Sequence, residues 1–287
     1  MNMPSGNKAS NWKKIPPGGE YRAEAFLRER EKLCVAACAR FIRIEKSKDH
    51  VWCLDGKEGE ISAILLHSSH SLFPVFGKNL NIPSPRFLKR FLGKVPVHAL
   101  QGLRDDTALL EILLEDQGYF SSERIDYDLM SLDSAPKPRS LASGPEDLVI
   151  CPAKPEDEEQ LFALQAAYEQ EEVLPENAVF NAMSCRLNLK SILSRQSVLV
   201  AKLGAKIVGK INTNLESFTR YQIGGVYIIP GYRSLGIGTK MIAVFAQELL
   251  AKGKALTLFV KKRNTAAIRI YRNAGFSSLA DYRITYY

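Results

Sequence analysis

Residues 226–239 read V-Y-I-I-P-G-Y-R-S-L-G-I-G-T and give the clearest indication of the fold. A β-branched run ends at Pro230, glycines follow, and an apolar pattern from Thr239 to Lys252 predicts a helix. Backbone N–H groups at such a strand-to-helix step can point at an anion, and glycines let a pyrophosphate approach closely. We therefore expect an anion-binding loop, with an ordinary helix-entry turn as the alternative. The pattern continues neither as a Walker loop nor as G-x-G-x-x-G.

A second pattern, N-T-A-A-I-R-I-Y-R-N-A-G-F, occupies residues 264–276 and follows a β-branched run at residues 256–260. It predicts a helix over residues 265–274. Together the two patterns closely resemble the two acetyl-CoA motifs of the GNAT N-acetyltransferase superfamily, over roughly residues 147–287. Within that superfamily, Q-I-G-G-V-Y at residues 222–227 is similar to the FR47-like branch, which includes glycine N-acyltransferase-like proteins.

The resemblance implies an acetyl-CoA site with a role for each matching residue. Val226, Tyr227 and Ile228 match the strand whose backbone contacts the acetyl and pantetheine groups. Asn264 matches the side chain that contacts the pantetheine arm, and Tyr271 matches the tyrosine that protonates the leaving thiolate. A phenol can also fill that role on chemical grounds, although a core tyrosine is the alternative. The pyrophosphate loop is matched by Arg233, Ser234, Leu235, Gly236, Ile237, Gly238 and Thr239.

The general base that many family members carry is missing here. The matching positions, on the strand before the loop and on the next strand, hold Gln222 and Phe259, and neither can take a proton from an ammonium. Water or a carboxylate from elsewhere must then do so. Glu216, Glu171 and Glu172 are the candidates, with a solvated surface position as the alternative for each.

The mechanism that the resemblance implies is direct transfer of acetyl from acetyl-CoA to a primary amine in a ternary complex. No cysteine falls in the two motifs, so a covalent acyl-enzyme has no obvious nucleophile. A second domain can enclose a small acceptor, which favours a small amine or amino acid over a protein. A CoA-binding regulatory or scaffold protein is the rival, because the carboxylates are missing.

Length and composition predict two domains. The 287 residues are 46% hydrophobic and 24% charged, as is typical of globular proteins, and no apolar run approaches the length of a membrane helix. Residues 133–146 are rich in Pro, Ser and Gly and predict a linker. We expect a flexible tail over residues 1–19, an α/β domain over 20–133, a linker over 134–146 and the GNAT domain over 147–287.

The fold class that follows is α/β of the α+β type, with a mixed, mostly antiparallel sheet flanked by helices. In the first half, periodicity predicts one long helix over residues 20–44, then three strands, a helix, a strand, a helix and a strand. This order is similar to a GNAT fold that has lost its cofactor loop. An unrelated α/β domain covering the acceptor cleft is the alternative, and either could shape the acceptor site or a dimer contact.

Charge predicts an anionic ligand for the second half. Residues 134–287 hold 20 Lys and Arg against 13 Asp and Glu, whereas residues 1–133 hold 19 against 18. The run Lys261-Lys262-Arg263 lacks interleaved aromatic residues, so we expect a solvated turn or contact with the adenosine 3′-phosphate rather than nucleic-acid binding. Tyr282, Tyr286 and Tyr287 are candidates for lining the acceptor pocket, with an ordinary half-buried strand as the alternative.

Cysteine and histidine usage predicts a metal-free protein of the cytoplasm. Five cysteines is an odd number, which fits a reducing compartment, and the N-terminus has no apolar signal-peptide core. Cys34 and Cys38 are expected in a core, and the pair His67 and His70 in a strand-end loop. Neither nucleic acid nor membrane is expected as a partner, whereas a homodimer is compatible with the sequence.

Overall fold

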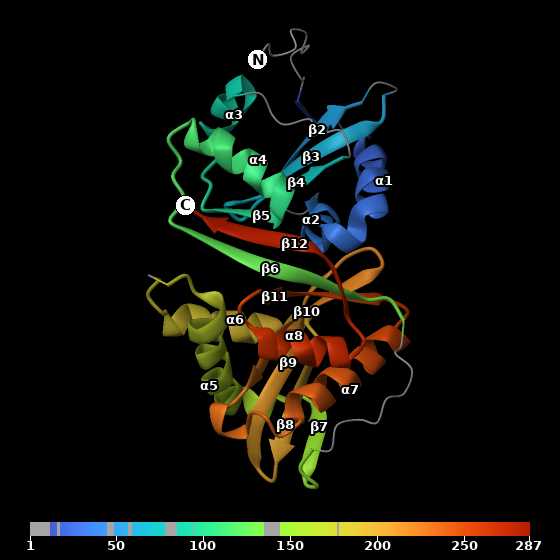
Figure 1. Ribbon diagram of the computed structural model, residues 1–287, viewed down its shortest axis with the longest axis vertical. Helices are drawn as coiled ribbons and strands as arrows, with labels where there is room; N and C mark the ends of the chain where they lie inside the picture. Colours follow the sequence, from blue (N-terminus) through green and yellow to red (C-terminus); the bar gives the residue numbers. More distant parts are fainter. Residues whose placement is uncertain are drawn as a thin grey trace. The chain divides into compact units, whose positions relative to one another are not determined.

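The computed structural model describes residues 12–15, 18–44, 49–56, 59–77, 85–93, 95–134, 144–176 and 178–287. The chain divides into two compact units (Figure 1). Unit 1 comprises residues 1–127 and 280–287, and unit 2 comprises residues 128–279. Each unit is a mixed α/β structure with a mostly antiparallel sheet, which confirms the predicted fold class. None of the helices in the described ranges combines the length and the apolarity needed to cross a membrane.

Unit 1 follows the element order predicted for the first half of the chain. Its strands lie in the order β1-β2-β3-β4-β5-β12-β6, and β4 and β5 are its parallel pair. Its elements are β1 (Lys13–Lys14), α1 (Glu20–Arg30), η1 (Glu31–Leu33), α2 (Val35–Phe41), β2 (His50–Asp55), β3 (Ile61–Ser68), β4 (Ser71–Phe76), α3 (Pro85–Leu92), β5 (Ala99–Leu103), α4 (Arg104–Glu115), the first half of β6 (Glu123–Leu132) and most of β12 (Ser277–Tyr286).

The single helix expected over residues 20–44 is wrong. Cys34 leaves the helical region, with φ −137° and ψ 36°, so α1 passes through the turn η1 and the chain starts again as α2. Nearly every residue of α2 is buried, which a helix with one apolar stripe could not achieve. The break lets both short helices pack against β3.

The tail expected over residues 1–19 is partly wrong, because part of it belongs to the core. Trp12 is only 4% exposed and stacks on Phe87, with ring centroids 5.7 Å apart. The next two residues pair with β2 in an antiparallel register. A large indole gains much from burial, and this offsets the cost of ordering the segment around it. Residues 1–11 and 16–17 of the expected tail lie outside the described residues.

Unit 2 has helices on both faces of its sheet. Its strands lie in the order β6-β11-β10-β9-β8-β7, and β10 and β11 are parallel. Its elements are the second half of β6, β7 (Leu148–Pro152), η3 (Pro155–Asp157), α5 (Glu158–Tyr168), η4 (Glu169–Val173), α6 (Ala182–Arg195), β8 (Val198–Leu203), β9 (Lys206–Glu216), β10 (Arg220–Ile228), η5 (Pro230–Tyr232), α7 (Ile237–Ala251), β11 (Ala255–Lys261), α8 (Thr265–Asn273) and the start of β12.

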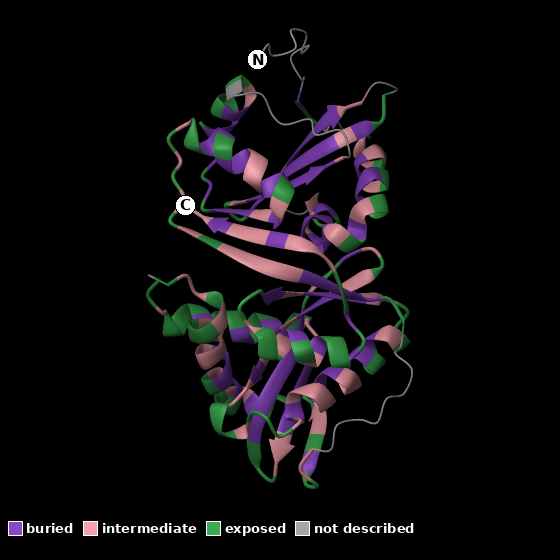
Figure 2. Ribbon diagram, viewed as in Figure 1, coloured by how far each residue is buried: buried purple, intermediate pink, exposed green. Residues whose placement is uncertain are grey.

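Alternation along β8 creates the two cores of unit 2. Leu199 and Ala201 pack into the core that contains α7 and α8, whereas Val200 packs into the core that contains α5 and α6. Successive side chains of a strand point to opposite faces, so one short apolar run serves both layers. Figure 2 shows the resulting band of buried residues along the strands of this unit.

The two parallel strands of unit 2 part before they end. Pairing of β10 with β11 stops at Ile223, five residues before β10 ends. On its other edge β10 stays paired with β9, through a register shift between Gly224 and Tyr227. Gly225 lies in this bulge with φ +59°, and a Cβ there would overlap the side chain of Asn212. The bulge therefore requires glycine, and it leaves the end of β10 with one free edge.

The units divide the chain differently from the boundaries expected at 20–133 and 147–287. Residues 128–132 of β6 belong to unit 2, and residues 280–287 belong to unit 1, where Tyr282–Tyr286 pair with β5. Arg283 holds this strand in place, because it forms ion pairs with Asp126 and Glu111. Most of the expected linker, residues 135–143, lies outside the described residues.

Candidate functional site

A pocket of about 820 Å³ opens in unit 2 where β10 and β11 diverge. The end of β10, the following loop, the start of α7, the end of β11, α8 and η4 surround it. Leu235 of the predicted loop is not part of its lining, and its side chain is largely exposed. The structure otherwise brings the predicted cofactor residues together there: Val226, Tyr227, Ile228, Arg233, Ser234, Gly236, Ile237, Gly238, Thr239 and Asn264.

The loop is shaped for an anion by two residues with positive φ. Ser234 has φ +65° and Gly236, the N-cap of α7, has φ +77°. The helix begins at Ile237 rather than at Thr239, so its first N–H groups, which have no acceptor inside the helix, lie at the pocket. A Cβ at Gly238 would make only ordinary contacts. Glycine is therefore required at position 236 more than at position 238.

Arg233 is engaged by protein groups. Its Nε donates to the carbonyl oxygen of Ile228 at 2.9 Å, and its Nη2 donates to Oε2 of Glu171 at 2.9 Å. The hydrogen bond from Arg233 holds the pKa of Glu171 below its ordinary value. A pyrophosphate at this loop would compete with the Glu171 carboxylate for the same guanidinium.

Glu172 lines the pocket between two predicted site residues. Its Oε1 accepts from Nδ2 of Asn264 at 3.2 Å, and its Oε2 lies 3.6 Å from Nζ of Lys261. Asn264 also caps α8, because its Oδ1 accepts from the backbone of Ala267 at 3.0 Å. The carboxylate of Glu172 therefore lies inside the candidate site and has a cation beside it.

Tyr271 is buried on α8 and remains a phenol over a wide pH range. Its ring packs edge-on against Phe276, with centroids 5.9 Å apart. Burial raises its pKa above the ordinary value, and the nearby Tyr168 and Glu172 raise it further. A protonated phenol next to the pocket can act as an acid toward a leaving thiolate.

Other candidates lie away from the pocket. Glu216 is at the end of β9, opposite Tyr221 at the start of β10, and forms an ion pair with Lys254 at 2.7 Å. It is not among the lining residues, so we do not retain it as a base. Tyr282 belongs to unit 1. Gln222 is buried, and its Oε1 has no hydrogen-bond partner within the described part of the chain.

A buried lysine behind the β10 bulge was missed by sequence reasoning. Lys210 is 1% exposed, and its Nζ donates to the carbonyl oxygen of Gly225 at 2.9 Å and to Oδ1 of Asn212 at 3.1 Å. The Nζ also lies 4.9 Å from the ring centroid of Tyr168, whose hydroxyl accepts from the N–H of Gly225. Burial lowers the pKa of Lys210 to about 7. The feature of the sequence that could have indicated Lys210 is a single charged residue within the apolar run of β9.

All five cysteines lie within the described residues and are free. Cys34 and Cys38 are buried in unit 1, with their sulfur atoms 3.6 Å apart, as expected of core positions. Across the part of the chain that the structure describes, no group of three or more His, Cys, Asp or Glu side chains is arranged to hold a metal ion.

Comparisons with known proteins agree with this geometry. The sequence model of the acetyltransferase (GNAT) family matches residues 158–276. A Drosophila protein solved as a structural-genomics target superposes with a TM-score of 0.66 at 10% identity, covering 96% of this chain and 98% of its own. A GCN5-related N-acetyltransferase from Sphaerobacter thermophilus gives 0.60 at 17% identity, covering 96% and 94%. The comparison with curated proteins found no match.

A third solved structure, described as a tandem GNAT protein from the clavulanic acid biosynthesis pathway, gives a TM-score of 0.54 at 10% identity and covers 96% of this chain and 98% of its own. At such identities the likeness shows the fold alone. It extends over unit 1 as well as unit 2, and it does not single out the FR47-like branch, which stays a prediction. Residues 158–276 thus match the acetyltransferase (GNAT) family, and the rest of the chain shares the fold of GNAT structures.

Proposed function

We propose that the chain is an acetyl-CoA-dependent N-acetyltransferase that moves an acetyl group directly to a primary amine in a ternary complex. One observation carries the proposal: the anion loop, the free edge of β10, Tyr271 and Glu172 all line one pocket. The two sequence motifs supply separate elements of the fold, and the fold brings them together. A small amine or amino acid is the acceptor that we favour, and the cytoplasm is the compartment.

Backbone geometry supports a role for β10 in holding the thioester. The N–H of Ile229 donates to Val208 of β9, so by alternation the polar groups of Val226 and Ile228 point away from β9 toward the open edge. The carbonyl oxygen of Ile228 already accepts from Arg233 on that side. Backbone donors on this edge can polarise the thioester carbonyl without rearranging.

Proton transfer then divides between two side chains. The amine nitrogen attacks the carbonyl carbon, the C–S bond breaks, and Tyr271 gives its phenolic proton to the leaving sulfur. Glu172 takes the proton that the ammonium must lose, directly or through water. The support for Glu172 is its place in the pocket beside Asn264 and Lys261, which Glu216 does not share.

The first test measures thermal unfolding with and without acetyl-CoA in the wild type and in Gly236→Glu. A ligand at 100 times its Kd adds about 2.7 kcal/mol to the folded state, so the wild type should shift upward. The variant should not shift, because it places a carboxylate where the pyrophosphate binds. Gly253→Glu is the matched control: Gly253 has φ +80°, lies just beyond the other end of α7 and has open space around its Cβ position. No wild-type shift would overturn the cofactor assignment.

The missing carboxylates at Gln222 and Phe259 favour one rival, a CoA-binding regulatory or scaffold protein. Release of free CoA from acetyl-CoA in the presence of a panel of primary amines discriminates the two. An enzyme releases CoA in an amine-dependent way, and Glu172→Gln lowers kcat/KM for the amine. A scaffold binds acetyl-CoA and shows no amine-dependent release above the uncatalysed rate.

A further inference from the structure

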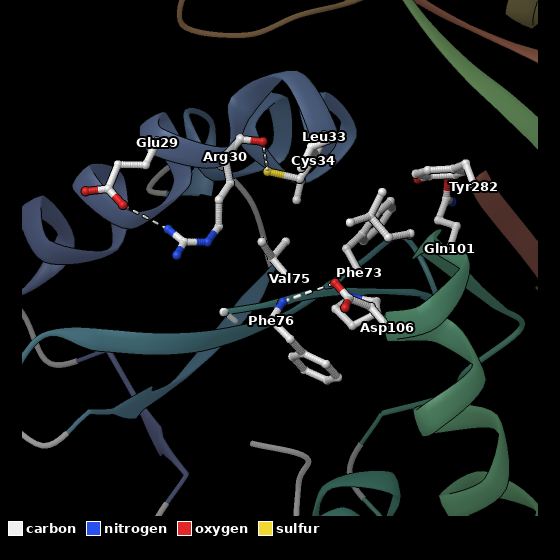
Figure 3. Close-up of a pocket in the computed structure, with 15 residues that line it drawn as sticks. Glu29, Arg30, Leu33, Cys34, Phe73, Val75, Phe76, Gln101, Asp106 and Tyr282 are labelled. Carbon is white, nitrogen blue, oxygen red and sulfur yellow. Dashed lines mark hydrogen bonds and ion pairs between the residues drawn. The ribbon is translucent and has the colours of Figure 1, made fainter. Parts of the chain in front are cut away.

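A second cavity, of about 380 Å³, lies in unit 1, and Figure 3 shows its lining side chains. It shares no lining residue with the 820 Å³ pocket of unit 2, which is called the transfer pocket below. It opens where β4 and β5 part, because their parallel pairing stops at Leu72 and Leu100. All of its lining residues belong to unit 1, whereas all of those around the transfer pocket belong to unit 2. The function proposed above therefore leaves this cavity unexplained.

A buried carboxylate lies in this cavity. Asp106, on the first turn of α4, is 7% exposed, and its Oδ2 accepts from the backbone N–H of Phe76 at 3.2 Å. Burial raises its pKa to about 6, so the side chain is mostly ionised at neutral pH. No described cationic side chain acts on it, and the other charge it senses is that of Asp105, which is also negative. A buried charge without a counter-ion is costly to the fold.

The basic residues nearby are occupied by other groups. Arg30 lines the cavity, but its Nη1 lies 3.0 Å from Oε2 of Glu29 and 3.3 Å from the carbonyl oxygen of Phe26, and it covers the Phe26 ring. Arg40 is not among the lining residues, and its guanidinium stacks on the Phe73 ring at 4.2 Å. Neither arginine serves as the counter-ion of Asp106.

The remaining walls are mainly apolar. The remaining polar side chains in the lining are those of Gln101, Cys34 and Glu29, of which Glu29 is 75% exposed, apart from the Tyr282 hydroxyl. An apolar cavity with one buried carboxylate is complementary to a molecule that has an apolar body and a single positive charge. A carboxylate ligand would instead be repelled by Asp106. The apolar lining includes the side chains of Leu33, Ala37, Phe73, Val75, Leu103 and Tyr282.

We propose that this cavity binds a small organic cation, a primary amine with an aliphatic or aromatic body, and that Asp106 is its counter-ion. The ammonium supplies the charge that the protein does not, and the apolar body fills the space between α2 and the diverging strands. Unit 1 is then an amine-binding module in its own right. This inference does not depend on the chemistry in unit 2.

The test uses phenethylamine and its neutral analogue 2-phenylethanol as probes, titrated calorimetrically into the full chain at pH 7.5. The amine should bind, and the alcohol should bind at least about tenfold more weakly, because it lacks the charge. Asp106→Asn should weaken the amine by about the same factor and leave the alcohol unchanged. Asparagine keeps an oxygen to accept the Phe76 N–H, so the variant should fold, and thermal unfolding checks that it does.

Asp105→Asn is the matched control. Asp105 is the neighbour of Asp106 in the same helical turn, but its side chain is 91% exposed, so its variant should bind the amine as the wild type does. Equal affinity of the wild type and Asp106→Asn for phenethylamine would overturn the proposal. Equal affinity of the wild type for amine and alcohol would do the same.

An optical signal separates this site from an acceptor site in unit 2. Both tryptophans of the chain, Trp12 and Trp52, lie in unit 1, and Trp12 contacts the ring of Phe76. Phenethylamine should change their fluorescence in Gly236→Glu and Glu172→Gln as it does in the wild type. A change lost in Glu172→Gln and kept in Asp106→Asn would place the amine in unit 2 and refute the proposal, while leaving the proposed function intact.

Discussion

The gap between β4 and β5 in unit 1 and the gap between β10 and β11 in unit 2 begin in the same way and end differently. In each, a parallel pair stops after a few residues. In unit 1 a side chain of the protein occupies part of the gap, because Asp106 accepts a hydrogen bond from the backbone N–H of Phe76. In unit 2 the gap stays open as a large pocket beside a glycine loop. Parting strands thus create an opening, and nearby side chains decide what can occupy it.

The largest expected effect comes from a variant that tests whether the open gap of unit 2 is a catalytic site. Tyr271→Phe removes the proposed acid and should lower kcat by about 100-fold or more, with little change in the Kd for acetyl-CoA. Tyr221→Phe, a conservative change on β10 outside the pocket lining, should leave kcat within about twofold. Steady-state kinetics and calorimetry measure the two quantities. An unchanged kcat in Tyr271→Phe would show that the acid lies elsewhere.

The next effect concerns the bulge that holds the gap in unit 2 open. Gly225→Ala should destabilise the protein by about 3 kcal/mol, because the new Cβ meets positive φ and the buried side chains of Asn212 and Lys210. Gly253→Ala, which also has positive φ but has open space around it, should cost only about 1 kcal/mol. Urea unfolding measures both changes. Equal losses would mean that the packing around the bulge contributes nothing.

A third effect concerns the side chain that fills part of the gap in unit 1. Because the pKa of Asp106 is about 6 when folded, against an ordinary value of 3.8, the native state favours the protonated form. That contribution to the free energy of unfolding is fully present below pH 4 and is lost as the pH rises through 6, about 3 kcal/mol in all. Asp106→Asn should be more stable than the wild type at pH 7.5 by about that amount, and its stability should vary less between pH 4 and 7. Urea unfolding at several pH values, with Asp105→Asn as control, measures this. A wild-type curve that stays flat over this range would contradict it.

The smallest effect concerns Arg233, which lines the open gap and forms an ion pair with Glu171. Glu171→Gln frees Arg233 for a phosphate and should tighten acetyl-CoA binding about two- to fivefold, since exposed ion pairs are weak. The gain should shrink at high salt. Calorimetry at two salt concentrations measures it. Weaker binding in the variant would show that Glu171 positions Arg233 rather than competing for it.

The sequence predicts unit 2 better than unit 1 for a physical reason. The loop before α7 and the helix α8 each require specific residues at fixed spacing, such as Gly236 at the helix entry and Asn264 at the cap, so their patterns are visible locally. The break at Cys34 and the burial of Trp12 depend on packing against distant strands. Local periodicity cannot report such contacts.

The candidate site divides in the same way. Motif spacing selected residues most of which line one pocket, but it could not separate Glu172, which lies in that pocket, from Glu216, which is paired with Lys254. Lys210 and Asp106 carry no motif at all. Each is a charge whose meaning comes from burial, and burial is decided by elements that are far apart in the chain.

The pairing of β12 with β5 has a consequence for synthesis. Residues 282–286 complete the sheet around β5, yet they leave the ribosome after more than 150 intervening residues have been made. All the residues of unit 2 have been synthesised by the time residue 279 emerges. In unit 1, by contrast, the edge of β5 that pairs with β12 stays unpaired until residues 282–286 emerge. During translation the first half of the chain is thus the last to finish folding, and it is the part that needs protection from aggregation at that edge.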